Sequence, residues 1–295
     1  MNTQLANFLG SHFTNPENGL RAGRLQRSSP LHLDGAGPPS AREQRTPKVL
    51  LALTLAAMLG GTASLASAAT LDINPSKDNT LYEYVPADGD RSNALGLHFF
   101  TGETADGELR RGVLAFDIAG HIPAGSTITS VTLTLNMSMT PSGTPRTTEL
   151  HKLLADWGEG TSQATGGEGT GAPATTNDAT WRHRFFDTIF WTIEGGDFSG
   201  TVSASQSVGD PGVYTWSSPQ MAADVQSWLD NPATNFGWLV LGDESNVATA
   251  KRFDTRESTN PPVLTIEYTR AGPRPRPTPR PRPTPPQHEA TATGE

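Results

Sequence analysis

The chain has 295 residues, of which 35% are hydrophobic and 18% charged, and its 30 glycines and 24 prolines favour many turns between short elements. Residues 69–270 hold 12 Lys and Arg against 25 Asp and Glu, a net charge of −13, which argues against a protein that binds nucleic acid through its phosphates. The absence of cysteine excludes disulfides, thiolate zinc sites and cysteine nucleophiles.

The N-terminal 68 residues resemble an export segment. Lys48 precedes an apolar run over residues 49–59, and Ala66-Ser67-Ala68 presents the small residues that signal peptidase prefers. A transmembrane anchor is the alternative, but a span needs about 20 apolar residues and glycines interrupt this stretch. We therefore expect residues 1–68 to be a disordered, extended n-region with a signal peptide, and the protein to be secreted without a membrane span. The long n-region leaves open a start codon further downstream.

Alternating apolar and polar residues predict strands in the central segment. In the clearest case, residues 128–135, Val131, Leu133 and Leu135 share one face and threonines the other. Similar patterns lie at residues 112–117, 236–241 and 263–268, and turn residues at 123–126, 141–143 and 210–212 separate such segments. The sequence predicts an all-β, jelly-roll-like antiparallel β-sandwich over residues 69–270.

One short helix is expected after this series of turns. Pro219 suits a first helical position behind a Ser217 or Ser218 cap, and Asp230-Asn231-Pro232 ends the run. The apolar residues that recur at helical spacing are Met221, Val225, Trp228 and Leu229.

Two segments lack any periodicity. Residues 158–180 are rich in Gly, Thr, Ala and Ser, and a loop of this length is either functional or disordered. Residues 271–295 alternate proline with arginine and threonine, which predicts a disordered, polyproline-like spacer. The tail's alternative role is a cationic strip that contacts anionic wall polymer.

Short motifs over most of residues 70–270 resemble the DNRLRE-domain family, which overlaps carbohydrate-binding module family 96. They are Asp78-Asn79-Thr80-Leu81-Tyr82-Glu83, Arg111-Gly112-Val113-Leu114-Ala115-Phe116-Asp117-Ile118, Asp156-Trp157-Gly158-Glu159-Gly160, Ala179-Thr180-Trp181, Glu194-Gly195-Gly196-Asp197-Phe198, Asp224-Val225-Gln226-Ser227-Trp228-Leu229, Asn235-Phe236-Gly237-Trp238, and Arg256-Glu257 before Pro262-Val263-Leu264. The order and spacing carry the resemblance. It implies a jelly-roll-like sandwich in secreted bacterial proteins, with alginate binding described for the module.

Sugar-binding proteins use aromatic faces for C–H surfaces and charged or amide groups for hydroxyls. Trp228 and Trp238 fall on periodic faces and are expected in the core. The predicted ligand-binding residues combine tryptophans beside the long loop with the basic clusters of the domain: Trp181, Arg182, Arg184, Trp191, Arg110, Arg111, Lys251, Arg252 and Arg256. The alternatives are packing of the tryptophans beneath the loop, and pairing of the cations with Asp117, Asp254 or Glu257.

Asp78, Asp88 and Asp90 supply oxygen ligands that suit calcium, so a structural calcium held by loops is the metal hypothesis; the alternative is a solvated turn. No complete catalytic motif occurs, which predicts a protein that is not an enzyme, although a glycosidase carboxylate pair depends on spatial separation and stays open. The sequence thus leaves two functions: a module that binds extracellular polysaccharide, or a structural or adhesive β-sandwich of the cell surface or matrix.

Cleavage of the export segment gives the first test. Mass spectrometry of culture supernatant should find a mature chain that starts at Ala69, because the small residues before it fit signal peptidase. Recovery of an uncleaved chain in the membrane fraction would contradict this expectation.

Overall fold

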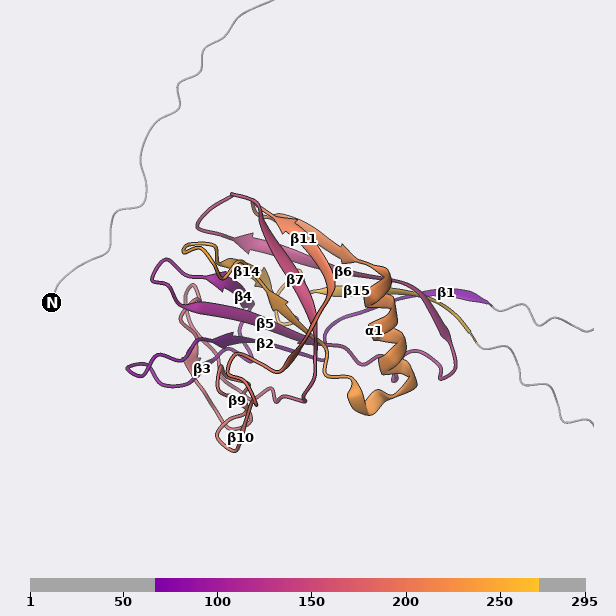
Figure 1. Ribbon diagram of the computed structural model, residues 1–295, viewed down its shortest axis with the longest axis horizontal. Coiled ribbons are helices and arrows are strands. Elements are labelled where there is room, and N and C mark those ends of the chain that lie inside the picture. Colours follow the sequence, from indigo (N-terminus) through magenta and orange to yellow (C-terminus); the bar gives the residue numbers. More distant parts are fainter. Residues whose placement is uncertain (1–66, 271–295) are drawn as a thin grey trace, which may run out of the picture. The chain divides into compact units, whose positions relative to one another are not determined.

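Antiparallel strands curl into a β-sandwich in residues 67–270, the part of the chain that the computed structural model describes (Figure 1). The all-β fold class is therefore confirmed. Most of the expected export segment and the whole proline-rich tail lie outside the described residues. No helix in residues 67–270 is long and apolar enough to cross a membrane.

Two layers share one continuous sheet. The first layer contains β1 (Ala68–Ile73), β15 (Val263–Thr269), β6 (Thr127–Met139), β12 (Gly212–Ser217) and β14 (Lys251–Asp254). The second contains β2 (Lys77–Tyr82), β5 (Leu109–Ala115), β13 (Trp238–Leu241), β7 (Arg146–Leu153) and β11 (Phe198–Val208).

Strand β4 (His98–Glu103) joins the two layers. Its residues 98–101 pair with β14, and Gly102 and Glu103 pair with β5. Gly102 has a φ of +100°, which a residue with a side chain adopts only under strain, so the glycine allows the strand to change partners here. Outside the layers lie β3 (Arg91–Ser92) with β8 (Ala172–Pro173), β9 (His183–Phe185) with β10 (Ile189–Phe190), the helix α1 (Pro219–Asp230) and the 3₁₀ turn η1 (Pro232–Thr234).

The inner core lies between the layers and beneath α1. Strand β6 contributes Val131, Leu133 and Leu135 as buried residues, which confirms the predicted strand and its inward face. The other three predicted strands fall at β5, β13 and β15, with ends that differ by up to two or three residues, and the predicted turns lie between strands.

Helix α1 begins as expected. The Ser218 hydroxyl accepts a hydrogen bond from the Met221 amide at 3.0 Å, and Pro219 occupies the first helical position. Met221, Val225, Trp228 and Leu229 are all buried, so the predicted helix and its apolar face are confirmed. Trp228 and Trp238 lie in the inner core as predicted, with ring centroids 4.5 Å apart in an edge-to-face arrangement.

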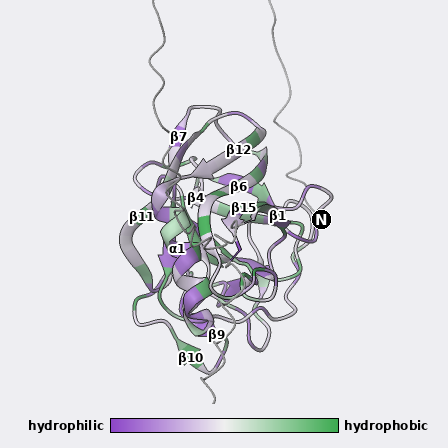
Figure 2. Ribbon diagram, turned by 90° about the vertical axis from the view of Figure 1, so that its right-hand side faces the viewer, coloured by the Kyte–Doolittle hydropathy of each residue, from purple (hydrophilic) through white to green (hydrophobic). Residues whose placement is uncertain are grey.

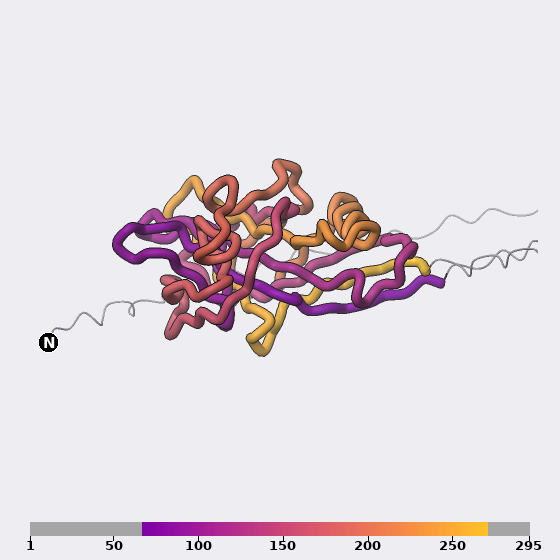
Figure 3. The backbone as a smooth tube through the Cα atoms, turned by 90° about the horizontal axis from the view of Figure 1, so that it is seen from below, coloured from indigo at the N-terminus to yellow at the C-terminus, as the bar shows by residue number. Residues whose placement is uncertain are grey.

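The outer face of the second layer is also buried. Along β13, Trp238 and Val240 face the inner core, whereas Leu239 faces a second cluster on the far side of the sheet. This outer core combines strand residues with residues of the segment between β7 and β11, which winds over this part of the domain in Figure 3. Its buried members are Leu81, Val113, Ala115, Leu153, Trp157, Ala179, Trp181, Trp191 and Leu239. We call residues 154–197 the cover.

The cover contradicts the disordered alternative for residues 158–180, because hydrogen bonds hold this stretch in place. The Glu168 carboxylate accepts bonds from the Leu97 amide at 3.2 Å and the His98 amide at 2.9 Å. The Asp178 carboxylate accepts bonds from the amides of Gly160 and Thr175 at 3.0 and 2.6 Å. Both acids are buried, so these charge-assisted bonds form away from bulk water.

Asp224 is a buried acid on the apolar face of α1. One of its oxygens accepts bonds from the Ser203 hydroxyl at 2.5 Å and the Trp238 indole at 3.1 Å, and so ties the helix to β11 and β13 of the second layer. Replacement of Asp224 by Ala leaves two buried donors without partners. We expect a loss of about 2–3 kcal/mol in the free energy of unfolding, measured by urea denaturation.

The matched control is Asp230→Ala. Asp230 lies on the same helix but is exposed, and its bond to Gln226 is at the surface. This change should alter stability by no more than about 0.5 kcal/mol. Equal effects of the two substitutions would show that Asp224 does not hold the helix on the second layer.

Candidate functional site

All six tryptophans are buried, which contradicts the prediction that Trp181 and Trp191 contact a ligand. Trp181 is 7% exposed and Trp191 is 5% exposed. The Arg111 guanidinium lies 4.7 Å from the centroid of the Trp181 ring, and the Trp191 indole donates to the Thr180 carbonyl at 2.9 Å. Both rings belong to the outer core, because the cover supplies few other large apolar side chains to bury the sheet face beneath it.

The predicted cations do not form one basic surface, because four of the arginines are neutralised inside the domain. Arg110 and Arg111 are neighbours on β5 and contact opposite faces of the sheet, Arg110 over Tyr82 and Arg111 over Trp181. The ion pairs are Arg110 with Glu108, Arg111 with Glu244, Arg182 with Asp90, and Arg256 with Glu159 and Glu257. Of the three acids expected as partners, Glu257 alone pairs with one of these arginines in the described chain, and Arg110, Arg111 and Arg182 pair with other acids.

Lys251 is also unable to contact a ligand directly. Its side chain is buried, and the ammonium group donates to the Thr140 hydroxyl and to the carbonyls of Ser142 and Gly209 at 2.9, 2.8 and 3.2 Å. Burial lowers the pKa of Lys251, with the nearby Arg146 acting in the same direction. Three neutral acceptors fill the three donor positions of the ammonium group, so Lys251 joins two turns to β14 and serves the fold. Arg252, next on β14, donates to the Ser138 hydroxyl at 3.1 Å.

The predicted calcium ligands do not come together. Asp78 is fully buried in β2, Asp88 pairs with Arg91 at 3.7 Å, and Asp90 contacts Arg182. No cluster of three or more His, Asp or Glu side chains within residues 67–270 has an arrangement that could hold a metal ion. The calcium hypothesis is therefore not supported by the geometry of these acids.

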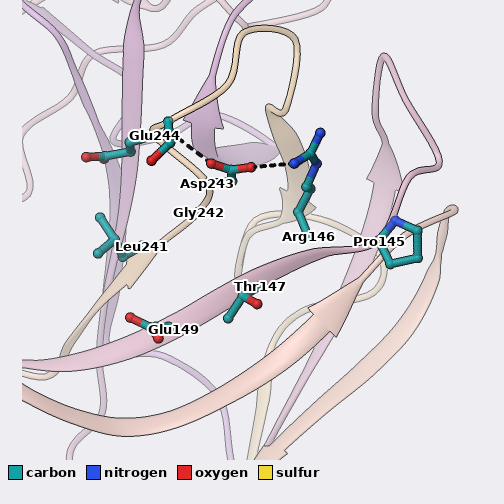
Figure 4. A pocket seen from close by; sticks show the side chains of 9 residues that line it. Pro145, Arg146, Thr147, Glu149, Leu241, Gly242, Asp243 and Glu244 are labelled. Atoms are coloured by element: carbon teal, nitrogen blue, oxygen red, sulfur yellow. Dashed lines mark hydrogen bonds and ion pairs between the residues drawn. The ribbon is translucent and has the colours of Figure 1, made fainter.

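A large open groove lies between β7 and the turn after β13, with a volume of about 510 Å³ (Figure 4). Three acids line it, and each has an internal partner. Asp243 pairs with Arg146 at 3.1 Å, Glu244 pairs with Arg111 at 2.8 Å, and Glu149 contacts the His151 imidazole at 3.1 Å. The groove thus shows few polar groups that are free to recognise a ligand.

The hairpin of β9 and β10 exposes apolar side chains at the surface of the cover. Phe190 is 61% exposed and Ile189 42%, and Phe185 is half-buried opposite Ile189. Figure 2 shows β10 coloured as hydrophobic at the lower end of the molecule. The register shifts between the Ile189–Phe185 and Phe190–His183 pairs, so Arg184 has no partner on β10, as in a β-bulge. We call Arg184, Phe185, Ile189 and Phe190 the hairpin platform.

The exposed Phe190 ring is held in place from below. Its centroid lies 4.1 Å from that of the His183 imidazole, and the two planes are inclined by 30°. His183 is itself buried, with its Nδ1 atom 3.4 Å from a carboxylate oxygen of Asp90 and 3.3 Å from the Thr180 hydroxyl. A large exposed aromatic ring over a fixed support presents a flat apolar face to solvent without the entropy of a free side chain.

Asp90 organises this support. It also binds the Arg182 guanidinium, whose carbon lies 3.6 Å from the centroid of the Tyr84 ring. Burial of Asp90 would raise its pKa, but hydrogen bonds from Arg182 and Thr180, together with the charges of Arg182 and His183, lower the pKa overall. The predicted residue Arg182 is therefore part of the support beneath the platform.

Arg184 is the predicted cation that stays available on the platform. It has no carboxylate within ion-pair distance among the described residues, and its guanidinium donates to the Asp156 carbonyl at 3.1 Å. The guanidinium carbon lies 5.5 Å from the centroid of the Phe185 ring. A cation beside an aromatic face is a combination that suits sugar hydroxyls or carboxylates together with a C–H surface.

The exposed aromatic residue of this segment is not one of its tryptophans. The prediction from the sequence named Trp181 and Trp191 and overlooked Phe185 and Phe190, which lie between them. The available signal was the spacing Phe185-Phe186-Asp187-Thr188-Ile189-Phe190, which is typical of a short hairpin with an apolar pair beside its turn. Neither a scan against protein-family models nor a search of curated proteins finds a match for this chain.

Replacement of Asp90 by Ala should remove the support of the platform. We expect a loss of about 1–3 kcal/mol in the free energy of unfolding at neutral pH, because the Thr180 hydroxyl and the Arg182 guanidinium lose their shared acceptor. The pKa of Asp90 is lower in the folded state than in the unfolded chain. Its charged form therefore stabilises the fold at any pH above the unfolded-state pKa, and this stabilisation is lost as the pH falls through the folded-state pKa. The difference in free energy of unfolding between wild type and Asp90→Ala should therefore decrease at acidic pH, as measured by urea denaturation across pH.

The control is Asp88→Ala, which removes a neighbouring acid that is exposed and only loosely paired with Arg91. It should have little effect at any pH. If the difference in free energy of unfolding between wild type and Asp90→Ala stayed constant down to acidic pH, the charged form of Asp90 would not be what stabilises the platform.

Proposed function

We propose that this protein is a secreted, non-catalytic domain that binds an extracellular polysaccharide through the hairpin platform. The observation that carries the proposal is Phe190, which is 61% exposed yet stacked on a buried histidine. An aromatic face presented in this way suits the C–H surface of a sugar ring, and each such contact contributes about 0.5–1.5 kcal/mol beyond the area it buries. The neighbouring Ile189 extends the apolar surface.

The position of the platform favours contact with a large ligand. Residue Ala68 of β1 pairs with Thr269 of β15, so both ends of the described chain leave from one place. Figures 1 and 2 place the β9–β10 hairpin away from that point. A long polymer on the platform would lie away from the first and last described strands.

The charges near the platform favour a neutral or weakly charged glycan. Arg184 is the cation of the platform, whereas Arg110, Arg111, Arg182 and Arg256 are neutralised by internal acids. A uronate polymer such as alginate would require several cations that converge on its carboxylates, and residues 69–270 carry a net charge of −13. The resemblance to carbohydrate-binding module family 96 suggests a uronate instead. The salt dependence of binding distinguishes a uronate from a neutral glycan.

A structural or adhesive domain without a small ligand is the second candidate. It is favoured by the burial of all six tryptophans and by the internal pairing of most arginines, which leave little conventional sugar-binding surface. The two functions differ in whether the isolated protein binds any polysaccharide.

Affinity electrophoresis of the full chain in gels of neutral and uronate polysaccharides tests the proposal. Phe190→Ala should weaken binding roughly tenfold and leave the circular dichroism spectrum unchanged, since an exposed ring contributes little to the core. Arg184→Ala should weaken binding to a uronate polymer and remove its salt dependence, but should change binding to a neutral glycan little.

The matched control is Val213→Ala on β12, which removes an apolar side chain that is similarly exposed but lies on the other layer. Its binding should equal that of wild type. Wild-type mobility that no polysaccharide changes would defeat the binding proposal and favour the structural one. Loss of binding in Val213→Ala alone would place the contact on the first layer.

A further inference from the structure

Three carboxylates contact Arg256 beside the start of β2, one through its main-chain amide and two through its guanidinium. The Asp78 side chain accepts a hydrogen bond from the Arg256 amide at 2.9 Å, and the Asp78 amide donates to Glu159 at 2.8 Å. The Arg256 guanidinium donates to Glu159 at 2.5 Å and to Glu257 at 2.8 Å. We call Asp78, Glu159, Glu257 and Arg256 the carboxyl cluster. It joins β2, the cover and the segment after β14.

The cluster has more acid than its single arginine can satisfy. One oxygen of Asp78 and one of Glu257 are buried without any hydrogen-bond partner. Asp78 is 0% exposed, so water does not reach its free oxygen. A buried carboxylate oxygen without a donor is costly, and the cost is removed when the carboxyl binds a cation or a proton.

A proton fits this site better than a metal ion. Within residues 67–270 no group of acids has an arrangement that could hold a metal, and the guanidinium already binds Glu159 and Glu257. The nearby Lys77 ammonium group does not neutralise the cluster fully, since it pairs with Asp156 at 2.9 Å and also donates to the Trp157 carbonyl. A proton on Asp78 would turn its free oxygen into a hydroxyl donor.

We propose that the carboxyl cluster is a proton-operated clamp. It takes up protons when the chain folds, and at alkaline pH it ionises, so that repulsion between its acids loosens the attachment of the cover and of residues 255–258 to β2. The effect extends to the β9–β10 hairpin, because the Gly158 amide, next to Glu159, donates to the Arg184 carbonyl at 2.8 Å.

The electrostatics of the cluster agree with this geometry. Burial raises the pKa of Asp78 well above its usual value, and the charges of Glu257 and Glu159 add to the increase against the opposing effect of Arg256. Burial likewise raises the pKa of Glu159 to about 7, against the hydrogen bond from Asp78 and the charges of Arg256 and Lys77. The charged groups that face the cluster are thus Lys77 from β2, Glu159 with Asp156 from the cover, and Arg256 with Glu257.

The sign of the effect follows from the raised values. Between the ordinary pKa of a carboxyl and the raised pKa in the fold, the folded state holds protons that the unfolded chain has released. The protonated cluster therefore contributes its full stabilisation at a pH below the ordinary pKa of a carboxyl group. For Glu159 this stabilisation is lost as the pH rises through about 7, its pKa in the fold.

The test is urea unfolding of the full chain at about pH 5 and about pH 8, for wild type, Asp78→Asn and Glu159→Gln. Asn places an amide donor where the proton would lie, so it imitates the protonated acid. We expect the unfolding equilibrium constant of wild type to rise at least about tenfold over this range, and each variant to lose much of that rise. Glu267→Gln, which changes an exposed acid on β15, should keep the wild-type rise.

The proposal would be overturned if the unfolding equilibrium constant of wild type did not rise with pH. It would also be overturned if the Asp78→Asn and Glu159→Gln variants kept the full wild-type rise in that constant. If a variant fails to fold, infrared spectroscopy of the wild-type protein at neutral pH decides, because the clamp requires a protonated carboxyl band that disappears at alkaline pH. Absence of that band would overturn the proposal equally. Neither measurement involves a polysaccharide, so the result is independent of ligand binding.

Discussion

Burial of both faces of β5 and β13 is the constraint on which the rest of the domain depends. Leu114 and Val240 face the inner core, whereas Val113 and Leu239 face outward. A strand that is apolar on both faces needs a cover on each side. The first layer buries one face and the cover buries the other, and Trp157, Trp181 and Trp191 are the large apolar side chains that the cover buries against the sheet. These tryptophan rings are buried against the sheet and are not available to a ligand.

The cover is held without disulfides. Buried acids perform this task, since Glu168 and Asp178 bind main-chain amides of β4 and of the cover itself. Charge-assisted bonds to amides are among the stronger hydrogen bonds in proteins, and they fix loops that cannot pair as strands. Part of the acidic charge of residues 69–270 thus serves the fold. Other acids pair with Arg110, Arg111, Arg182 and Arg256, so these four arginines do not form a surface for polyanions.

The candidate binding surface is what the cover leaves exposed. Phe190 is exposed on the cover, whereas Trp181 belongs to the outer core, and His183 and Asp90 support the Phe190 ring from beneath. The carboxyl cluster holds the same cover at its other attachment, through Glu159, and Gly158 bonds directly to β9. A change in protonation at the cluster and a ligand on the platform would therefore act on one continuous segment, which gives the two proposals a common structural basis.

Local patterns in the sequence were sufficient for the strands and the helix. The alternation along residues 128–135 and the Ser218 cap before Pro219 depend on neighbours in the chain, and the structure confirms both. Core positions for Trp228 and Trp238 followed from the same periodicity. Aromatic and basic residues are concentrated at residues 181–191, and the proposed binding surface lies in the same segment.

Only the tertiary structure decided which of those residues face solvent. Trp181 and Phe190 are both large aromatic side chains in one short segment, but the first packs on a sheet face formed by distant strands and the second does not. Asp78, Glu159 and Arg256 are separated by many residues and meet only when β2, the cover and the segment after β14 fold together. Exposure, ion pairing and proton affinity depend on partners far away in the chain, and the order of residues determines them only through the fold that brings those partners together.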